Sequence, residues 1–276
     1  MKPALAQVCS LNAPLEQDIA DYAAGQCQAV ELWWGKVETY LEKHSPAELR
    51  ALLDRHSMTA PVVSYQGGLL TSQGDYRKEH WASFGRRLKL CQELGVETMV
   101  VAGDIAGPLT QQDFERVQMS LREAADLASR HDVRLALEFQ ARAALGNNLQ
   151  TAASLVAETD SPHLGLCLDA FHYYVGPSKS EDLGYLTREN LFHVQLCDLS
   201  GTLRETATDG DRVLPGDGDF ALEPIVAHLR AIRYERFVSV ELMNPQLWLV
   251  PPRQFGEIAL TSLRKVLGLA DMGGGK

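Results

Sequence analysis

The sequence lacks the features that mark several large classes of protein. Its 276 residues include only five cysteines, and no two of them form a Cys-x-x-Cys pair, so the thiols are expected to be reduced. No apolar stretch approaches the roughly 20 residues that a membrane span needs. The apolar run within residues 1–18 is too short for a secretory signal. We therefore expect a cytoplasmic protein with no membrane partner.

Positive charge is also scarce in this chain. The formal net charge is −10, from 26 basic and 36 acidic residues. Binding to a nucleic-acid backbone needs clustered Lys and Arg side chains. We therefore expect no nucleic-acid partner, although the charge balance still permits a small basic pocket.

What the sequence does contain is a regular alternation of apolar and amphipathic segments. The apolar segments are rich in Val, Leu and Ala without polar alternation, which is typical of parallel strands covered on both faces. We count eight strand–helix units, with expected strands at 4–11, 29–34, 58–66, 97–104, 133–140, 164–172, 191–199 and 237–244.

Eight such units in about 270 residues predict an α/β protein, a single-domain (β/α)₈ TIM barrel over residues 1–270. The last residues, 271–276, are expected to form a flexible tail. The alternative is an open doubly wound sheet, which usually carries a glycine-rich phosphate turn after the first strand. No Gly-x-Gly-x-x-Gly pattern occurs anywhere in the chain, so the barrel is favoured.

Polar side chains gather where the later expected strands end, which is where barrel enzymes place their chemistry. Residues two apart on a strand point to the same side. By this rule Glu138, Asp169, Gln195 and Glu241 share a side with small residues, and large aliphatic side chains occupy the alternate positions. The sequence therefore predicts that these four side chains face the barrel axis.

Three carboxylates directed at one axis repel one another, and one would take up a proton without compensation. A divalent cation resolves this conflict, and an oxygen-rich ligand set suits Mn²⁺, Mg²⁺ or Co²⁺, with Zn²⁺ also compatible. We therefore expect one metal ion bound by Glu138, Asp169, Gln195 and Glu241. The alternative is that these residues form structural hydrogen bonds inside the barrel.

Five segments together resemble the xylose isomerase-like TIM barrels, the group also described as sugar phosphate isomerases/epimerases. They are LALEFQ, LCLDAFH, FHVQLCD, RVLPGDGDF and FVSVELMNPQLW. The resemblance implies metal-binding roles for Glu138, Asp169 and Glu241. It also matches a D-x-x-H pair to Asp169 and His172, and an Arg before Pro-Gly to Arg212.

The sequence departs from the family pattern at two places. Gln195 stands where many members have a His, and a similar Gln occurs in members that resemble bacterial 3-dehydroshikimate dehydratases. The second departure is the loop at residues 199–211, which we expect to shape substrate choice.

The resemblance and the residue set imply an isomerase or epimerase that acts on a keto-sugar or a cyclic polyol. Glu138 and Glu241 would exchange a proton next to a carbonyl through an enediolate. His172 would bind a substrate oxygen or act as an acid. Arg212 would bind the substrate, and Trp33 and Tyr65 would form walls of the pocket. The expected substrate-binding residues are therefore Arg212, Trp33, Tyr65 and His172.

Three other functions stay open at this point. The main alternative is a metal-dependent dehydratase of a dehydroshikimate-like or inosose-like ring. A phosphodiesterase acting on abasic DNA shares the barrel, but it needs more ligands and a basic surface. The third of these is a barrel that binds a sugar without converting it. Related barrels form dimers or tetramers, so a homo-oligomer is also compatible with the sequence.

Overall fold

The computed structural model describes residues 1–269 and confirms the predicted TIM barrel. Eight parallel strands form a closed barrel in the order β1-β10-β7-β6-β5-β4-β3-β2. The barrel strands are β1 (Lys2–Ala6), β2 (Ala29–Trp33), β3 (Thr59–Gln66), β4 (Thr98–Ala102), β5 (Arg134–Glu138), β6 (Leu164–Asp169), β7 (Leu191–Leu196) and β10 (Phe237–Val240). Two short strands, β8 (Asp198–Leu199) and β9 (Arg212–Val213), pair antiparallel outside the barrel order.

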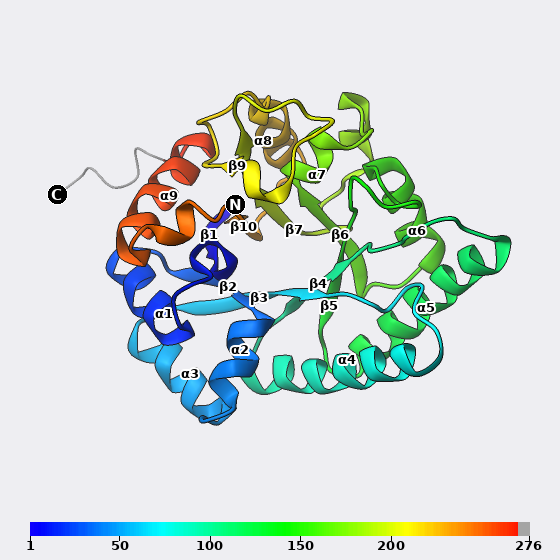
Figure 1. Cartoon of the computed structure of the whole chain (residues 1–276), viewed down its shortest axis with the longest axis horizontal. Helices are drawn as coiled ribbons and strands as arrows, with labels where there is room; N and C mark the ends of the chain where they lie inside the picture. Colours follow the sequence, from blue (N-terminus) through cyan, green and yellow to red (C-terminus); the bar gives the residue numbers. More distant parts are fainter. Residues whose placement is uncertain (270–276) are drawn as a thin grey trace. The chain divides into compact units, whose positions relative to one another are not determined.

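Helices alternate with these strands along the chain (Figure 1). They are α1 (Leu15–Ala24), α2 (Trp34–Leu41), α3 (Pro46–Arg55), α4 (Gly74–Leu94), α5 (Gln111–Ser129), α6 (Leu149–Thr159), α7 (Ala170–Val175), α8 (Leu222–Ala231) and α9 (Pro252–Val266). Four 3₁₀ segments complete the described chain: η1 (Gln7–Ser10), η2 (Ser180–Tyr185), η3 (Asp209–Asp211) and η4 (Leu247–Leu249). The eight predicted units are all present.

The helical segment that the sequence breaks near Pro46 shows how local chemistry sets the boundaries. Ser45 caps α3: its hydroxyl accepts a hydrogen bond from Glu48 N, and the Glu48 carboxylate accepts one from Ser45 N. Pro46 occupies the first helical position, where its missing N–H costs nothing. The chain therefore ends α2 and restarts as a separate helix.

Several expected boundaries are wrong. The strands expected at 164–172 and 237–244 end at Asp169 and Val240, and residues 170–172 already belong to α7. Residues 7–10 form the 3₁₀ turn η1 rather than the second half of the first strand. This turn lets the Ser10 hydroxyl reach Asp18 on α1, at 2.7 Å. The helix expected after the sixth strand is replaced by the short α7 and the 3₁₀ segment η2.

The backbone contacts divide the chain into two compact parts. The first part contains residues 1–61 and the residues from 194 onward. Within it β1 pairs with both β10 and β2, and β10 pairs with β7 in the register Ser239 opposite Gln195. The helices α1 and α9 pack against each other (Figure 1). This register brings the ends of β7 and β10, with Gln195 and Glu241, next to each other.

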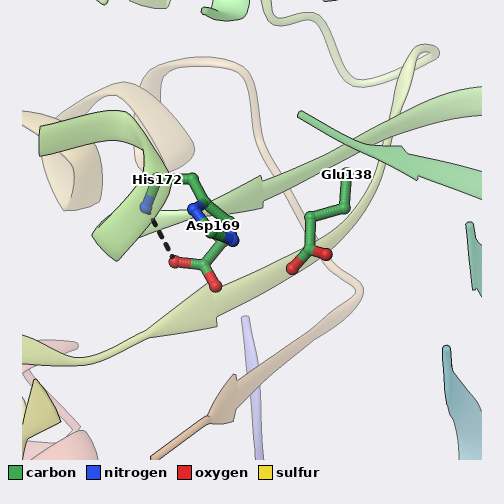
Figure 2. A group of neighbouring side chains, drawn as sticks. All are labelled: Glu138, Asp169 and His172. Carbon is green, nitrogen blue, oxygen red and sulfur yellow. Dashed lines mark hydrogen bonds between the residues drawn. The ribbon is translucent and has the colours of Figure 1, made fainter. Parts of the chain in front are cut away.

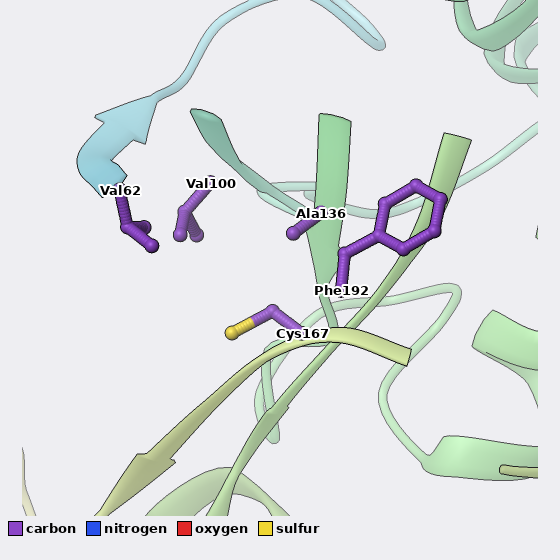
Figure 3. Packing of buried hydrophobic residues seen from close by; sticks show 5 residues of the cluster. All are labelled: Val62, Val100, Ala136, Cys167 and Phe192. Carbon is purple, nitrogen blue, oxygen red and sulfur yellow. The ribbon is translucent and has the colours of Figure 1, made fainter. Parts of the chain in front are cut away.

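The second part contains residues 62–193. Its strands β4, β5 and β6 pair in parallel register, with Ala136 opposite Val100 and Gly165. It contains a buried hydrophobic cluster of Val62, Val100, Ala136, Cys167 and Phe192, as Figure 3 shows.

No helix within residues 1–269 is both long and apolar enough to cross a membrane. The predicted tail at 271–276 lies outside the described residues, and the boundary at residue 270 stays a prediction.

Candidate functional site

Three buried polar side chains lie together in the second part of the chain (Figure 2). Glu138 is the last residue of β5, Asp169 is the last residue of β6, and His172 lies in the first turn of α7. Each offers one ligand atom, and these atoms all lie within 4.8 Å of one another. The three residues are 6%, 0% and 7% exposed. Their arrangement is typical of a metal or catalytic centre.

Asp169 is fixed because it both ends a strand and caps a helix. Its backbone is extended, and its Oδ1 accepts a hydrogen bond from the Phe171 N–H group at 2.6 Å. The same oxygen accepts one from the His172 N–H group at 3.3 Å, the bond that Figure 2 draws. A carboxylate that accepts backbone N–H groups is stabilised in its ionised form. The same cap turns the chain so that His172 comes back beside Asp169.

The tautomer of His172 follows from its backbone contact. The Ala141 N–H group donates to His172 Nδ1 at 3.4 Å. A ring nitrogen that accepts a hydrogen bond carries no proton, so the neutral ring carries its proton on Nε2. In this state His172 can donate a hydrogen bond from Nε2 but cannot bind a metal through that atom.

Gln140 provides the partner of Glu138. The sequence places both residues on one side of the strand, and the Gln140 Nε2 group donates to Glu138 Oε2 at 2.6 Å. Because an amide N–H group donates and a carboxylate accepts, this contact stabilises the charged form of Glu138.

A second set of polar side chains lies in the first part of the chain. Gln195 on β7 donates from Nε2 to Glu31 Oε1 on β2, at 2.8 Å, and to Glu241 Oε1, at 2.9 Å. Glu241 immediately follows β10, so Gln195 and Glu241 stand at the ends of neighbouring strands. All three side chains are buried. The side-chain alternation predicted for Gln195 and Glu241 is therefore present.

Arg212 is the cation of this second set. It is only 1% exposed, and its Nη1 donates to Glu241 Oε2 at 2.8 Å. Its Nε and Nη2 atoms donate to Asp209 Oδ1 at 3.0 and 2.6 Å. The predicted loop at 199–211 delivers it, because β9 pairs with β8 and closes this loop into a hairpin. A contact between Arg212 and a substrate stays a prediction.

Trp33, which the sequence places in the pocket wall, lines a cavity of about 540 Å³ in the first part. The cavity is bordered by residues 11–16 and by residues of α2, including Lys36 and Tyr40. The backbone N–H group of Trp33 donates to Gln7 Oε1 at 3.1 Å, which fixes the end of β2. The other expected wall residue, Tyr65 of β3, is 43% exposed.

Sequence reasoning assigns no role to Glu31 or Asp209, which the structure places against Gln195 and Arg212. Asp209 lies three residues before Arg212, and this spacing was the available signal. Glu31 stands at the end of an apolar strand, as the predicted ligands do. Its partner lies 164 residues away in the chain, so the contact has no local sequence signal.

Comparison with known proteins identifies the family. The model of the xylose isomerase-like TIM barrel family matches residues 19–265. The chain is 25% identical over 241 residues to an inosose isomerase of Bacillus velezensis, covering 86% of each protein. It is 24% identical over 261 residues to a 3-dehydroshikimate dehydratase of Pseudomonas putida, covering 92% of this chain and 40% of that protein.

The fold also matches a solved structure over nearly its whole length. The crystal structure of the IOLI protein with a bound zinc atom superimposes with a TM-score of 0.91 at 23% sequence identity, covering 97% of this chain and 98% of that one. The family match spans most of the chain, and its curated relatives include isomerases and dehydratases. The chain belongs to the xylose isomerase-like TIM barrel family.

Proposed function

We propose that this protein is a divalent-metal-dependent isomerase or epimerase of a keto-sugar or cyclic polyol. It would abstract a proton next to a carbonyl and pass through an enediolate. The observation that carries this proposal is the buried group of Glu138, Asp169 and His172, which combines two carboxylates with an N–H donor. The similarity to an inosose isomerase supports the substrate class.

The residues present fit a divalent cation. Two buried carboxylates whose ligand atoms lie within 4.8 Å repel each other, and a cation relieves this repulsion. In a closed parallel barrel the strand ends that carry the chemistry lie at one end. We therefore propose that Glu138, Asp169, Gln195 and Glu241 hold one metal ion.

The oxygen-rich ligand set suits Mn²⁺, Mg²⁺ or Co²⁺, and the zinc in the IOLI structure keeps Zn²⁺ among the candidates. When bound, such a cation polarises a carbonyl oxygen and stabilises the negative charge that forms on it.

Proton transfer falls to the side chains. Glu138 or Glu241 takes the proton from the carbon next to the carbonyl, and the other returns it to a neighbouring atom or to the opposite face. Return at the neighbouring atom gives an isomer, and return at the opposite face gives an epimer. His172 donates a hydrogen bond from Nε2 to a substrate oxygen, as its contact with Ala141 N allows.

We propose that the four residues that the sequence predicts for substrate binding contact the substrate. His172 contacts a hydroxyl or carbonyl oxygen. Arg212 offers an Nη N–H group that its bonds to Glu241 and Asp209 do not use. Trp33 is proposed as an aromatic wall, although the cavity of about 540 Å³ that it borders is lined by none of the four proposed metal ligands. Tyr65 provides an exposed ring on the second part of the chain.

The alternative function is a dehydratase of a dehydroshikimate-like or inosose-like ring. It is supported by Gln195 in place of the family's His and by the similarity to a 3-dehydroshikimate dehydratase. In this reaction the same base removes the proton, and His172 protonates the departing hydroxyl group.

Proton exchange provides the test. The purified enzyme, loaded with Mn²⁺, is incubated in D₂O with ketoses, inososes and 3-dehydroshikimate, and products are followed by NMR. We expect deuterium at the carbon next to the carbonyl of at least one substrate, with a new isomer or epimer. An absorbing conjugated product from a ring substrate indicates the dehydratase instead. No deuterium uptake and no product from any substrate would contradict both functions.

A matched variant connects the reaction to the residues. Glu138→Gln keeps the shape of the side chain but removes the base, so we expect a loss of exchange of about 10²-fold or more. Gln150→Ala, an exposed position on α6, serves as the control. Equal exchange in Glu138→Gln and wild type would contradict the role of Glu138.

A homo-oligomer and a cytoplasmic location remain proposals. They are checked by light scattering and by fractionation of the source cells.

A further inference from the structure

Glu31 is a buried acid in the first part of the chain that the proposed reaction does not use. It lies on β2, and the register places it opposite Ala6 of β1. Glu31 itself is only 1% exposed. A buried carboxylate needs a polar partner to offset the cost of its burial.

The partner is the side-chain amide of Gln195. Its Nε2 atom lies 2.8 Å from Glu31 Oε1 and 2.9 Å from Glu241 Oε1. An amide nitrogen carries two hydrogens, and an ionised carboxylate can only accept. Both hydrogens are therefore directed at the two acids. The reverse orientation would place the amide oxygen against two acceptor oxygens, so the chemistry excludes it.

This orientation decides which atom of Gln195 can bind a cation. With Nε2 committed to the two acids, Oε1 is the only ligand atom that the side chain offers. Glu241 belongs to the proposed ligand set and also accepts a hydrogen bond from Arg212 at 2.8 Å. Of the two acids that accept from the Gln195 amide, Glu31 is the one that does not belong to the proposed ligand set.

We propose that Glu31 is a positioning residue, which holds the Gln195 amide with its oxygen directed at the metal. The inference rests on the proposed function and deepens it. Metal-binding histidines are commonly oriented by a carboxylate on their second nitrogen. Here an acid performs the same task for an amide, and this explains how Gln can stand at a position where a His is usual.

The direct test is Glu31→Gln, which has the same shape but can both donate and accept. The Gln195 amide can then adopt either orientation. We expect the affinity for Mn²⁺, measured by isothermal titration of the metal-free protein, to fall about 10- to 100-fold. Glu42→Gln removes the same charge from an exposed position after α2, and its affinity is expected to stay within about twofold of wild type.

A double-mutant comparison separates positioning from a direct effect. In a Gln195→Ala background the amide is gone, so Glu31→Gln is expected to change Mn²⁺ affinity less than about twofold. Glu31→Asp keeps an acceptor-only group and is expected to lose less affinity than Glu31→Gln. Thermal unfolding of the metal-free proteins shows which variants are folded, and affinities are compared among those.

Three results would overturn the inference. Unchanged affinity in Glu31→Gln would show that Glu31 does not orient a ligand. An equal loss in the Gln195→Ala background would show that Glu31 acts on the metal directly or through charge alone. A wild-type protein that binds no Mn²⁺ would refute the proposed function itself, and the inference with it.

Discussion

At the scale of single residues, two amides hold two glutamates. Gln140, two residues past the end of β5, donates to Glu138, and Gln195 on β7 donates to Glu241, which follows the neighbouring strand β10. A neutral amide satisfies a carboxylate oxygen without adding a competing positive charge. Glu138 is satisfied in this way by an amide, whereas Glu241 accepts from the Gln195 amide and also forms a buried salt bridge with Arg212 at 2.8 Å.

Whether the sequence can predict such a hydrogen bond depends on how far apart its two residues lie in the chain. Gln140 lies two residues from Glu138, so the strand period was enough to place them together. The contact of Glu31 with Gln195 depends on the register and curvature of the closed barrel. No local pattern contains that information, and Glu31 accordingly received no role from the sequence.

A buried ion pair in the first part leads to a pH-dependent prediction. Asp18 accepts hydrogen bonds from Ser10 Oγ, at 2.7 Å, and from Lys36 Nζ. Burial raises the pKa of Asp18 to about 6, against the attraction of Lys36. Because the folded state holds this proton more tightly than the unfolded state, the contribution of Asp18 to stability falls as the pH rises from about 4 through 6.

The measurement is the titration of the Asp18 carboxyl carbon by NMR, assigned by comparison with Asp18→Asn. We expect its midpoint near pH 6, well above the usual pKa of an aspartate of about 4. An Asp18 midpoint at or below 4 would contradict the account, since it would mean that Lys36 and the hydrogen bonds outweigh burial.

At the scale of elements, one acid organises the segment after the seventh barrel strand. Asp198 accepts hydrogen bonds from Gly216 N, at 3.0 Å, and Phe220 N, at 2.8 Å. Gly218 lies between these two residues, where an added Cβ would overlap Asp198 Oδ1 and the Leu199 carbonyl oxygen. The Pro-Gly-Asp-Gly-Asp-Phe segment is therefore more than a turn before α8.

We expect Gly218→Ala to destabilise the protein by about 1–3 kcal/mol, because the overlap involves backbone that cannot move aside. Urea unfolding provides the measurement. Gly210→Ala is the matched control in the same region, since its Cβ would meet only ordinary contacts at 3.7 Å, and we expect a change within about 0.5 kcal/mol. Equal stability of the two variants would show that the segment is loosely held.

The elements that the sequence misplaced have two different physical causes. Residues 7–10 continue an apolar strand pattern, but they form a 3₁₀ turn in which the Ser10 hydroxyl bonds to Asp18 of the following helix. The segment at 180–185 contains Gly184 and is too short for a stable helix. The strand pattern carries no information on the first contact, whereas the second limit is local.

At the scale of the whole molecule, the fold was predictable because its signal is repeated. Eight apolar strands, each followed by a helical segment, can close only a small number of architectures, and parallel strands of this kind require covered faces. Misplaced boundaries do not alter that count. The substrate carries no comparable signal, because it depends on a few side chains, for which we propose Trp33 and Arg212, and on the loop at 199–211 as predicted.

The central claim is that one divalent cation binds the oxygens of Glu138, Asp169, Gln195 and Glu241. Anomalous diffraction at the manganese edge from crystals grown with Mn²⁺ tests it most directly. We predict a single strong peak with one oxygen of each of the four residues within about 2.6 Å. A map without a peak under saturating Mn²⁺, or a peak held by other side chains, would contradict it.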